Sequence, residues 1–325
     1  MQSRLRDRIF DRKAERTHLQ EVARSLGLFS LAFALLLTAC AAPADLLAGP
    51  LQVTDGLGRE ISLEGPAVRI VSLAPSNTEM LFAIGAGSQV VGRDEASDHP
   101  AQAAEVASIG STFGQLNTEA ILALDPDLVL AADITAPEQL QSMEALGLTT
   151  FVLANPSDFE GLYENLETVG ELTGHTVEAS ELAANLRARV ENVIATMGDI
   201  DRVAVFYEID GSDPSAPWTT GAGTFQDLLI ELAGGENVAS GIQGWGQIDI
   251  EQLVIQDPEV IVYGEGPFVV TTVQSLSERP GWDGIAAVQA GRVIPIDTNW
   301  VDRPGPRLVD ALEAMARALH PELFD

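Results

Sequence analysis

The 325-residue sequence is short of the residues that most catalytic and metal sites use: it has one cysteine, one lysine, four histidines and 6% aromatic residues. Because Cys40 has no second cysteine to pair with, an internal disulfide is excluded. A site for bare Zn²⁺ or Mn²⁺ gathers several histidines and carboxylates, whereas the histidines here are scattered, at His18, His99, His175 and His320. Neither G-x-S-x-G nor H-E-x-x-H occurs, so nucleophilic and zinc-dependent catalysis are poorly supported.

Positive charge is also scarce, and the formal net charge is −30. Residues 1–39 hold seven of the 18 basic residues and four of the 48 acidic ones, so the remainder carries 11 basic against 44 acidic residues. A phosphate backbone is bound by clustered Lys and Arg and is repelled by a field of this sign. We therefore expect no nucleic-acid partner.

The N-terminus has the composition of a targeting segment. Seven basic residues precede the apolar run "LGLFSLAFALLLTAC", which ends at Cys40 and is shorter than the ~18 to 20 residues that span a bilayer. The end of the run, "LTAC", resembles the bacterial lipobox, whose cysteine is acylated and begins the mature protein. This resemblance implies a lipoprotein signal peptide at 1–39, lipidation of Cys40 and a flexible tether at 40–52. A buried thiol or a short membrane anchor is the alternative.

The remainder of the chain alternates short apolar runs with helical patterns, which predicts parallel strands joined by helical crossovers. This alternation assigns one α/β lobe to residues 53–173 and a second to residues 199–325. Between them the strands disappear, and two consecutive helices are predicted, the second of which links the lobes at 174–198. The predicted fold class is α/β, with two lobes joined by a long helix. A chain of 325 residues is long for one domain and suits two.

The stretch "RIVSLAPSNTEMLFAIGAG" predicts a strand, a turn at Pro75 and a helix that Ser76 or Asn77 caps and Gly85 ends. The adjoining "GAGSQVVG" has glycines like those of a dinucleotide-binding loop. However, Gly85 ends a helix where that loop would have to begin one. Helix capping is therefore the better interpretation of these glycines.

One element occurs twice. The stretch "NTEAILALDPDLVLAAD" at 117–133 repeats as "DIEQLVIQDPEVIVYGE" at 249–265, at a constant offset of 132 and without a gap. Glu119 thereby aligns with Glu251, each on the first turn of a helix, where a carboxylate favours the positive end of the helix dipole. Helix stability would explain either glutamate alone. Their repetition indicates one exposed carboxylate on each lobe, arranged for a partner with two arginine-rich sockets.

From about Val53 to Leu319 the chain resembles the substrate-binding proteins of ATP-binding-cassette importers for cobalamin and ferric siderophores. The resemblance rests on "RIVSLAPSNTEMLFAIGAG", "SDHP", "LNTEAILALDPDLVL", "PWTTGAGTFQDLLIELAGGENV", "WGQIDIEQL" and "IPIDTNWVDRPGPRLVDAL", in this order. It implies two Rossmann-like lobes joined by a rigid helix, the class III periplasmic-binding-protein fold, with the ligand in the cleft between them. It also implies that Glu119 and Glu251 dock on arginines of two permease subunits, which work with ATPase subunits. We expect the binding protein itself to be a monomer.

The same resemblance implies a set of ligand-binding residues: Trp245, Phe113, Trp218, Trp300, Arg303, Pro75 and Ser76. Trp245 matches an aromatic residue that packs on the corrin ligand in cobalamin-binding members. Ala96 and Ala132, in contrast, stand where those members can have aromatic residues.

The function that these residues predict is a lipid-anchored binding protein on the extracytoplasmic face of the membrane, with no catalytic residue, cofactor or metal of its own. Its expected ligand is cobalamin or another corrinoid, since a largely neutral macrocycle suits an acidic protein. A ferric siderophore or haem is the alternative, although an anionic chelate would need local cations. An alternative of another class is a membrane-attached α/β enzyme such as a chelatase or hydrolase.

Overall fold

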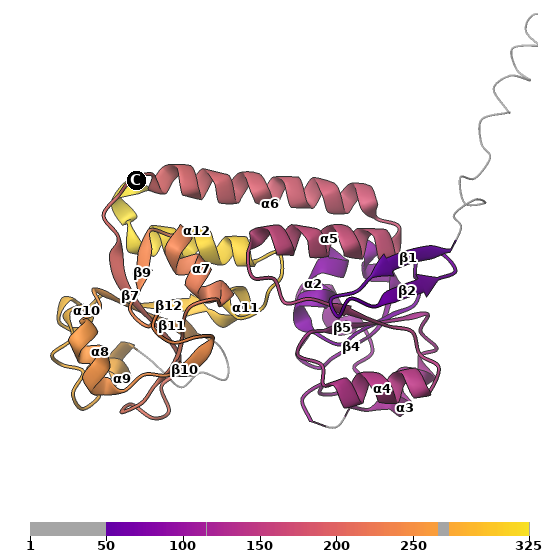
Figure 1. Ribbon diagram of the computed structural model, residues 1–325, viewed down its shortest axis with the longest axis horizontal. Coiled ribbons are helices and arrows are strands. Elements are labelled where there is room, and N and C mark those ends of the chain that lie inside the picture. Colours follow the sequence, from indigo (N-terminus) through magenta and orange to yellow (C-terminus); the bar gives the residue numbers. More distant parts are fainter. Residues whose placement is uncertain (1–49, 115, 266–272, 325) are drawn as a thin grey trace, which may run out of the picture. The chain divides into compact units, whose positions relative to one another are not determined.

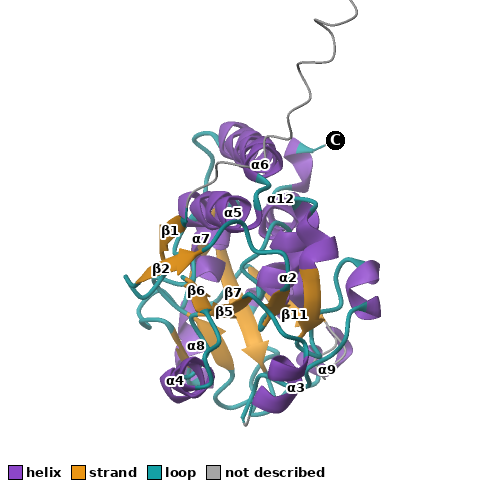
Figure 2. Cartoon of the chain, turned by 90° about the vertical axis from the view of Figure 1, so that its right-hand side faces the viewer, coloured by secondary structure: helices purple, strands orange, loops and turns teal. Residues whose placement is uncertain are grey.

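The computed structural model describes residues 50–114, 116–265 and 273–324. The predicted signal peptide and Cys40 lie outside the described residues. Within the described part, no helix is both long and apolar enough to cross a bilayer. Strands occupy the middle layer, with helices above and below them (Figure 2).

The first lobe contains a four-stranded parallel sheet with the order β4-β3-β5-β6. Its strands are β3 (Ile70–Ser72), β4 (Val90–Arg93), β5 (Leu128–Ala132) and β6 (Thr150–Leu153). An antiparallel hairpin, β1 (Leu51–Thr54) and β2 (Glu60–Leu63), precedes it. The helices between the strands are α2 (Pro75–Ala83), η2 (Ala86–Gln89), η3 (Ala101–Glu105), α3 (Thr118–Ala123) and α4 (Pro137–Ala145).

Helix α2 begins two to three residues earlier than the sequence predicts. Pro75 is the first helical residue, because its fixed φ suits this position and its missing N–H needs no partner there. The predicted caps Ser76 and Asn77 therefore lie inside the first turn, and the N-cap is Ala74, which provides no side-chain hydrogen bond. The predicted end at Gly85 is confirmed by its left-handed φ of 88° just beyond the helix.

The second lobe contains a six-stranded mixed sheet with the order β10-β8-β7-β11-β12, and β9 pairs with β7. Its strands are β7 (Val203–Asp210), β8 (Trp218–Thr220), β9 (Gly235–Asn237), β10 (Trp245–Gln247), β11 (Val260–Glu265) and β12 (Val293–Asp297). Strand β8 is antiparallel to both of its neighbours, β7 and β10, and the other pairings are parallel. The helices are α7 (Phe225–Leu232), α8 (Ile250–Gln256), α9 (Val273–Ser277), α10 (Ala286–Ala290), α11 (Thr298–Val301), α12 (Leu308–Leu319) and η4 (Pro321–Leu323).

Two long helices connect the sheets, α5 (Phe159–Thr173) and α6 (Thr176–Met197). Helix α6 runs alongside α5 at one end and α12 at the other (Figure 1). Arg189 on α6 forms ion pairs with Asp310 at 2.6 Å and Glu313 at 2.9 Å, both on α12. The long helix is therefore fastened to elements of both lobes.

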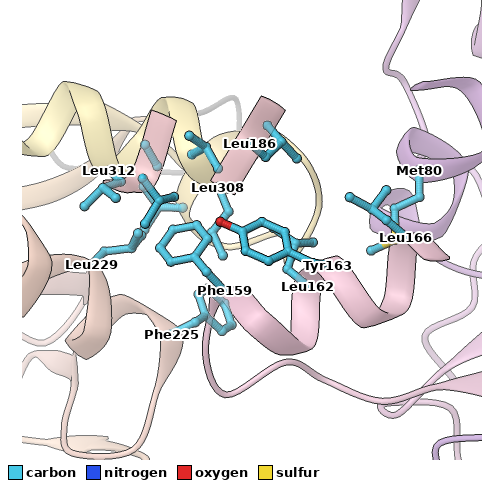
Figure 3. Packing of buried hydrophobic residues seen from close by; sticks show 14 of the residues in the cluster. Met80, Phe159, Leu162, Tyr163, Leu166, Leu186, Phe225, Leu229, Leu308 and Leu312 are labelled. Carbon is cyan, nitrogen blue, oxygen red and sulfur yellow. The ribbon is translucent and has the colours of Figure 1, made fainter. Parts of the chain in front are cut away.

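The main hydrophobic core is continuous from one lobe to the other. It includes Met80 of α2, Phe159 and Tyr163 of α5, and Leu229 and Leu312 of the second lobe (Figure 3). Phe159 and Tyr163 stack with ring centroids 6.4 Å apart. Because protein interiors are close-packed, a shared core of this kind resists large hinge motion between the lobes.

A buried ion pair also joins the lobes directly. The Glu79 carboxylate on α2 accepts hydrogen bonds from the backbone N–H and the Nε of Arg307, at 2.9 and 2.8 Å. Arg307 is the N-cap residue of α12, so the carboxylate lies at the positive end of that helix.

The repeat in the sequence corresponds to a repeat in the structure. Asp125 and Asp257, 132 positions apart, are the only non-glycine residues with positive φ in the described part, at 46° and 44°. Each precedes a proline and a sheet strand. Asp127 and Glu259 also match, because the backbone N–H of each donates at 2.9 Å to a carbonyl near the start of the neighbouring strand in its own sheet, β3 or β7. The two lobes therefore build the same helix, turn and strand.

Candidate ligand-binding cleft

Both lobes line a cleft of about 1170 Å³. Its lining follows the carboxyl ends of parallel strands: Ala74 beyond β3, Asp133 beyond β5 and Ala154 beyond β6 in the first lobe, and Asp210 and Thr298 at β7 and β12 in the second. Open α/β sheets bind ligands at this edge, because loops there can converge without interrupting the strand ladders.

Aromatic side chains form the apolar part of the cleft. Trp218 and Trp245 lie on the antiparallel strands β8 and β10, two positions apart in register and therefore on the same face. Their exposed fractions are 44% and 50%, and the Trp245 ring meets Phe225 edge-on at 6.5 Å. From the other lobe, Phe113 and Ile134 contribute side chains that are 76% and 70% exposed. The structure thus brings the predicted Trp245, Trp218 and Phe113 to one cavity.

Three further predicted residues line the cleft, and one does not. Pro75 and Ser76 come from the first turn of α2, and Arg303 from the loop after α11. Trp300 lies outside the cleft, where it packs against the main core beside α12. The reason is geometric: α11 places Asn299 and Asp302 in the cleft lining, and Trp300 on another side of this short helix.

Ala96 and Ala132 are also part of the lining, and both are partly buried. An aromatic side chain at either position would narrow the cavity, whereas the alanine methyl groups leave it open. The aromatic surface consequently comes mainly from the second lobe.

The charged lining is strongly negative: five carboxylates, Glu95, Asp98, Asp133, Asp210 and Asp302, face one guanidinium, Arg303. Arg303 forms an ion pair across the lobes with Asp98, at 2.7 Å. Burial opposes ionisation of Asp98, but the hydrogen bond and the charge of Arg303 outweigh it and lower its pKa. The single cation of the cleft is therefore engaged before any ligand arrives.

Asp302 lies in a different environment. The surrounding protein removes water from its carboxyl group and raises its pKa, an effect that hydrogen bonds from Gln226 and Tyr207 partly offset. Both donors reach the same oxygen, Oδ1, at 3.2 Å. Tyr207 is fully buried at the end of β7, so this aspartate is tied to the sheet of the second lobe.

A buried polar network supports the loop that carries Asp98. Asp94 accepts hydrogen bonds from the Ser97 hydroxyl and the Ala96 backbone N–H. The Ser97 hydroxyl also contacts the Thr78 hydroxyl, 2.8 Å away. Burial raises the pKa of Asp94, against these hydrogen bonds and nearby arginine charges. The loop is thus held to α2.

The repeated glutamates lie away from the cleft. Glu119 and Glu251 are exposed on the first turns of α3 and α8, which begin at equivalent caps, Asn117 and Asp249. Both helices lie on the side of the lobes opposite α6 (Figures 1 and 2). Each lobe therefore carries one exposed glutamate on the first turn of a helix that lies on this side of the protein.

Sequence reasoning missed most of the polar lining. Asp98 and Asp302 stand inside the quoted stretches "SDHP" and "NWVDRPG", where their charge was the available signal. Gln226, which is 3% exposed in the cleft wall, follows a helix cap and carries no local signal. Within the described residues, no cluster of three or more His, Cys, Asp or Glu is arranged to hold a metal ion.

Two α/β lobes that share a core and enclose an aromatic cleft at their strand ends define a bilobal solute-binding protein. Comparison with family models agrees: the chain belongs to the periplasmic binding protein family, whose model matches residues 70–299.

Among its relatives is an ABC transporter substrate-binding lipoprotein of Bacillus subtilis, 28% identical over 281 residues, with 85% of this chain and 87% of the relative covered. A cobalamin-binding protein of Halobacterium salinarum is 30% identical over 280 residues, which cover 83% of this chain and 74% of the relative. Among solved structures, a periplasmic haem-binding protein from Pseudomonas aeruginosa is similar with a TM-score of 0.70 and 28% identity, covering 78% of this chain and 93% of its own.

Proposed function

We propose that this chain is the extracytoplasmic binding protein of an ABC importer and that it holds a corrinoid in the cleft between its lobes. The observation that carries the proposal is the cleft itself, which is large, aromatic on one wall and formed at the strand ends of both sheets. Such a cavity suits a bulky planar ligand, because aromatic side chains provide contact area at a low entropic cost. The cobalamin-binding relative supports this choice.

The lining favours a corrinoid over haem. Haem iron in proteins is held by His, Cys, Met or Tyr side chains. The described lining residues include no His, Cys or Tyr, and Met80, at 1% exposure, is part of the core. A corrinoid carries its own axial ligands on cobalt and needs no such residue.

The charge of the lining disfavours an anionic ferric chelate. Its five carboxylates would oppose the ligand, and Arg303 is already paired with Asp98. Desolvating a charged ligand without a counter-charge is costly, whereas a neutral macrocycle brings no such penalty.

The exposed glutamates would then hold the permease. Glu119 and Glu251 occupy equivalent places on the two lobes, as contacts to two equivalent permease subunits require. Acylation of Cys40 would keep the protein at the membrane surface, which the lipoprotein relative supports. Neither role involves the cleft, so ligand binding and docking are separable by mutation.

Calorimetry tests the ligand assignment. The purified chain from residue 41 onward is titrated in parallel with cyanocobalamin, a ferric hydroxamate and haem. We expect micromolar or tighter binding of cyanocobalamin and much weaker binding of the other two. No heat with cyanocobalamin, together with tight binding of either iron compound, would transfer the assignment to iron uptake.

A further inference from the structure

Several side-chain amides in the cleft lining use their N–H groups within the protein. Asn77 directs its Nδ2 at two backbone carbonyls of β5, at 3.2 and 3.0 Å. Asn165 of α5 directs its Nδ2 at the carbonyl of Ala154, at 2.9 Å. Both side chains line the cleft, and no described residue donates to either amide oxygen. What these amides offer a ligand is therefore an acceptor.

The second lobe repeats this arrangement. Asn299 donates its Nδ2 to Asp297 at 2.8 Å, and Gln226 donates its Nε2 to Asp302 at 3.2 Å. Gln226 is almost fully buried in the cleft wall, and its Oε1 receives no hydrogen bond from the described residues. This buried oxygen is not open to the cleft, so the acceptors that a ligand can reach in the second lobe are the carboxylates.

The charges point in the same direction. Five carboxylates against one guanidinium give the lining a formal charge of −4, with Glu95, Asp98 and Asp133 on the first lobe and Asp210 and Asp302 on the second. Carboxylates accept hydrogen bonds and, when ionised, cannot donate them. A ligand therefore meets acceptors on both lobes.

From this set of acceptors we infer that the cleft recognises the primary carboxamide groups on the rim of its ligand and rejects the same ligand when an amide is replaced by a carboxylate. The inference rests on the proposed function and narrows it: the substrate class is a fully amidated corrinoid. Carboxamide N–H groups match the carboxylates of the lining without adding negative charge.

A carboxylate in the same place fails for two reasons. It has no N–H to donate, so an acceptor of the ligand would face the acceptors of the lining. It also places a like charge near several carboxylates in a partly desolvated cleft, where Coulomb repulsion is stronger than in water. The two effects add, and neither depends on the shape of the macrocycle.

The test compares cyanocobalamin with its isomeric monocarboxylic acids, in which one rim acetamide or propionamide is hydrolysed. Shape, metal and axial ligands are then constant. At neutral pH and low salt we expect at least one monoacid to bind about tenfold or more weakly than the amide by calorimetry. Asp210→Asn and Asp302→Asn should each narrow this ratio severalfold, since asparagine supplies a donor and removes a charge. Glu181→Gln, on the exposed side of α6 and outside the cleft lining, makes the same charge change and should leave the ratio unaltered.

The outcomes separate this inference from the function on which it rests. If cyanocobalamin and every monoacid bind within about twofold of one another, the inference is wrong and the proposed function stands. If the ratio is large but identical in both aspartate variants, the assigned acceptors are not its cause, and the inference is likewise overturned. If no corrinoid binds while haem or a ferric hydroxamate does, the proposed function fails and takes the inference with it.

Discussion

Replacing Trp245 by alanine tests the ligand wall of the cleft at its most informative residue. Trp245 begins a short edge strand, lines the cavity and is half exposed, and its ring meets Phe225 edge-on. The exposed half of the ring faces the open cleft. A ligand that fills the cavity would cover it.

The magnitude follows from this exposed area. A tryptophan side chain presents up to ~250 Å², so half exposure leaves roughly 100 Å² for a ligand to bury. At about 25 cal/mol per Å² this area contributes about 2.5 kcal/mol if fully covered, and less if partly covered. We therefore expect Trp245→Ala to weaken corrinoid binding by about 1 to 3 kcal/mol, or roughly 5- to 150-fold in Kd.

Calorimetry with cyanocobalamin measures this loss of affinity directly. Unlike a fluorescence titration, it does not depend on the tryptophan that the variant removes. Trp300→Phe is the matched control, because Trp300 packs beside α12 outside the cleft and should leave Kd unchanged. Trp245→Phe should retain part of the affinity. Wild-type affinity in Trp245→Ala, with the folded state verified by circular dichroism, would show that this wall does not contact the ligand.

Three further predictions address the surface, the anchor and the ion pair across the lobes. Glu119→Ala and Glu251→Ala should leave ligand affinity unchanged but weaken co-purification with the permease, by about 2 to 5 kcal/mol where the charge pair is desolvated, and most severely together; loss of ligand binding with intact docking would contradict the assignment. Cys40→Ala should move the protein from the detergent phase to the aqueous phase, because stable anchoring needs acyl chains, and an unmodified Cys40 thiol in the mature wild type would refute lipidation. Asp98→Asn should cost at most about 1 kcal/mol of unfolding free energy at pH 7. Since Arg303 lowers the pKa of Asp98, this contribution is present above the unfolded pKa near 3.8 and is lost as the pH falls below it. The urea midpoints of wild type and variant should therefore converge near pH 3. A difference in midpoint that stays constant with pH would exclude the ion pair as its source.

The repeated helix and turn could be predicted from the sequence because short-range physics determines it. Asn117 and Asp249 cap their helices by side-chain hydrogen bonds, and the glutamates two positions later occupy the first turn in both lobes. Asp125 then ends its helix in a left-handed conformation that aspartate tolerates better than most residues. Each of these sequence patterns spans only a few residues, and its recurrence 132 positions later makes the prediction stronger.

The cleft could be predicted only in part, because its polar character arises from contacts between distant segments. Gln226 acquires its role from Asp302, 76 positions away, and Asp98 from Arg303, 205 positions away. The family resemblance implies that Trp300 contacts the ligand, but a four-residue helix turns it towards α12. The predicted domain boundaries at 53–173, 174–198 and 199–325 stay a prediction, since residues 50–325 form one compact unit.

That compact unit links the cleft to the docking surface. The core runs through α5, α6 and α12 without interruption, and the Glu79–Arg307 pair fastens α2 to the first turn of α12. Removing one member of a buried pair leaves an uncompensated charge, so the joint favours a single arrangement of the lobes. Helices α3 and α8 are built on the strands that this core holds, and their glutamates consequently keep a fixed separation. A ligand that spans the cleft can then change the docking surface only by small adjustments of both lobes, and a permease with two rigidly spaced sockets would be sensitive to such adjustments.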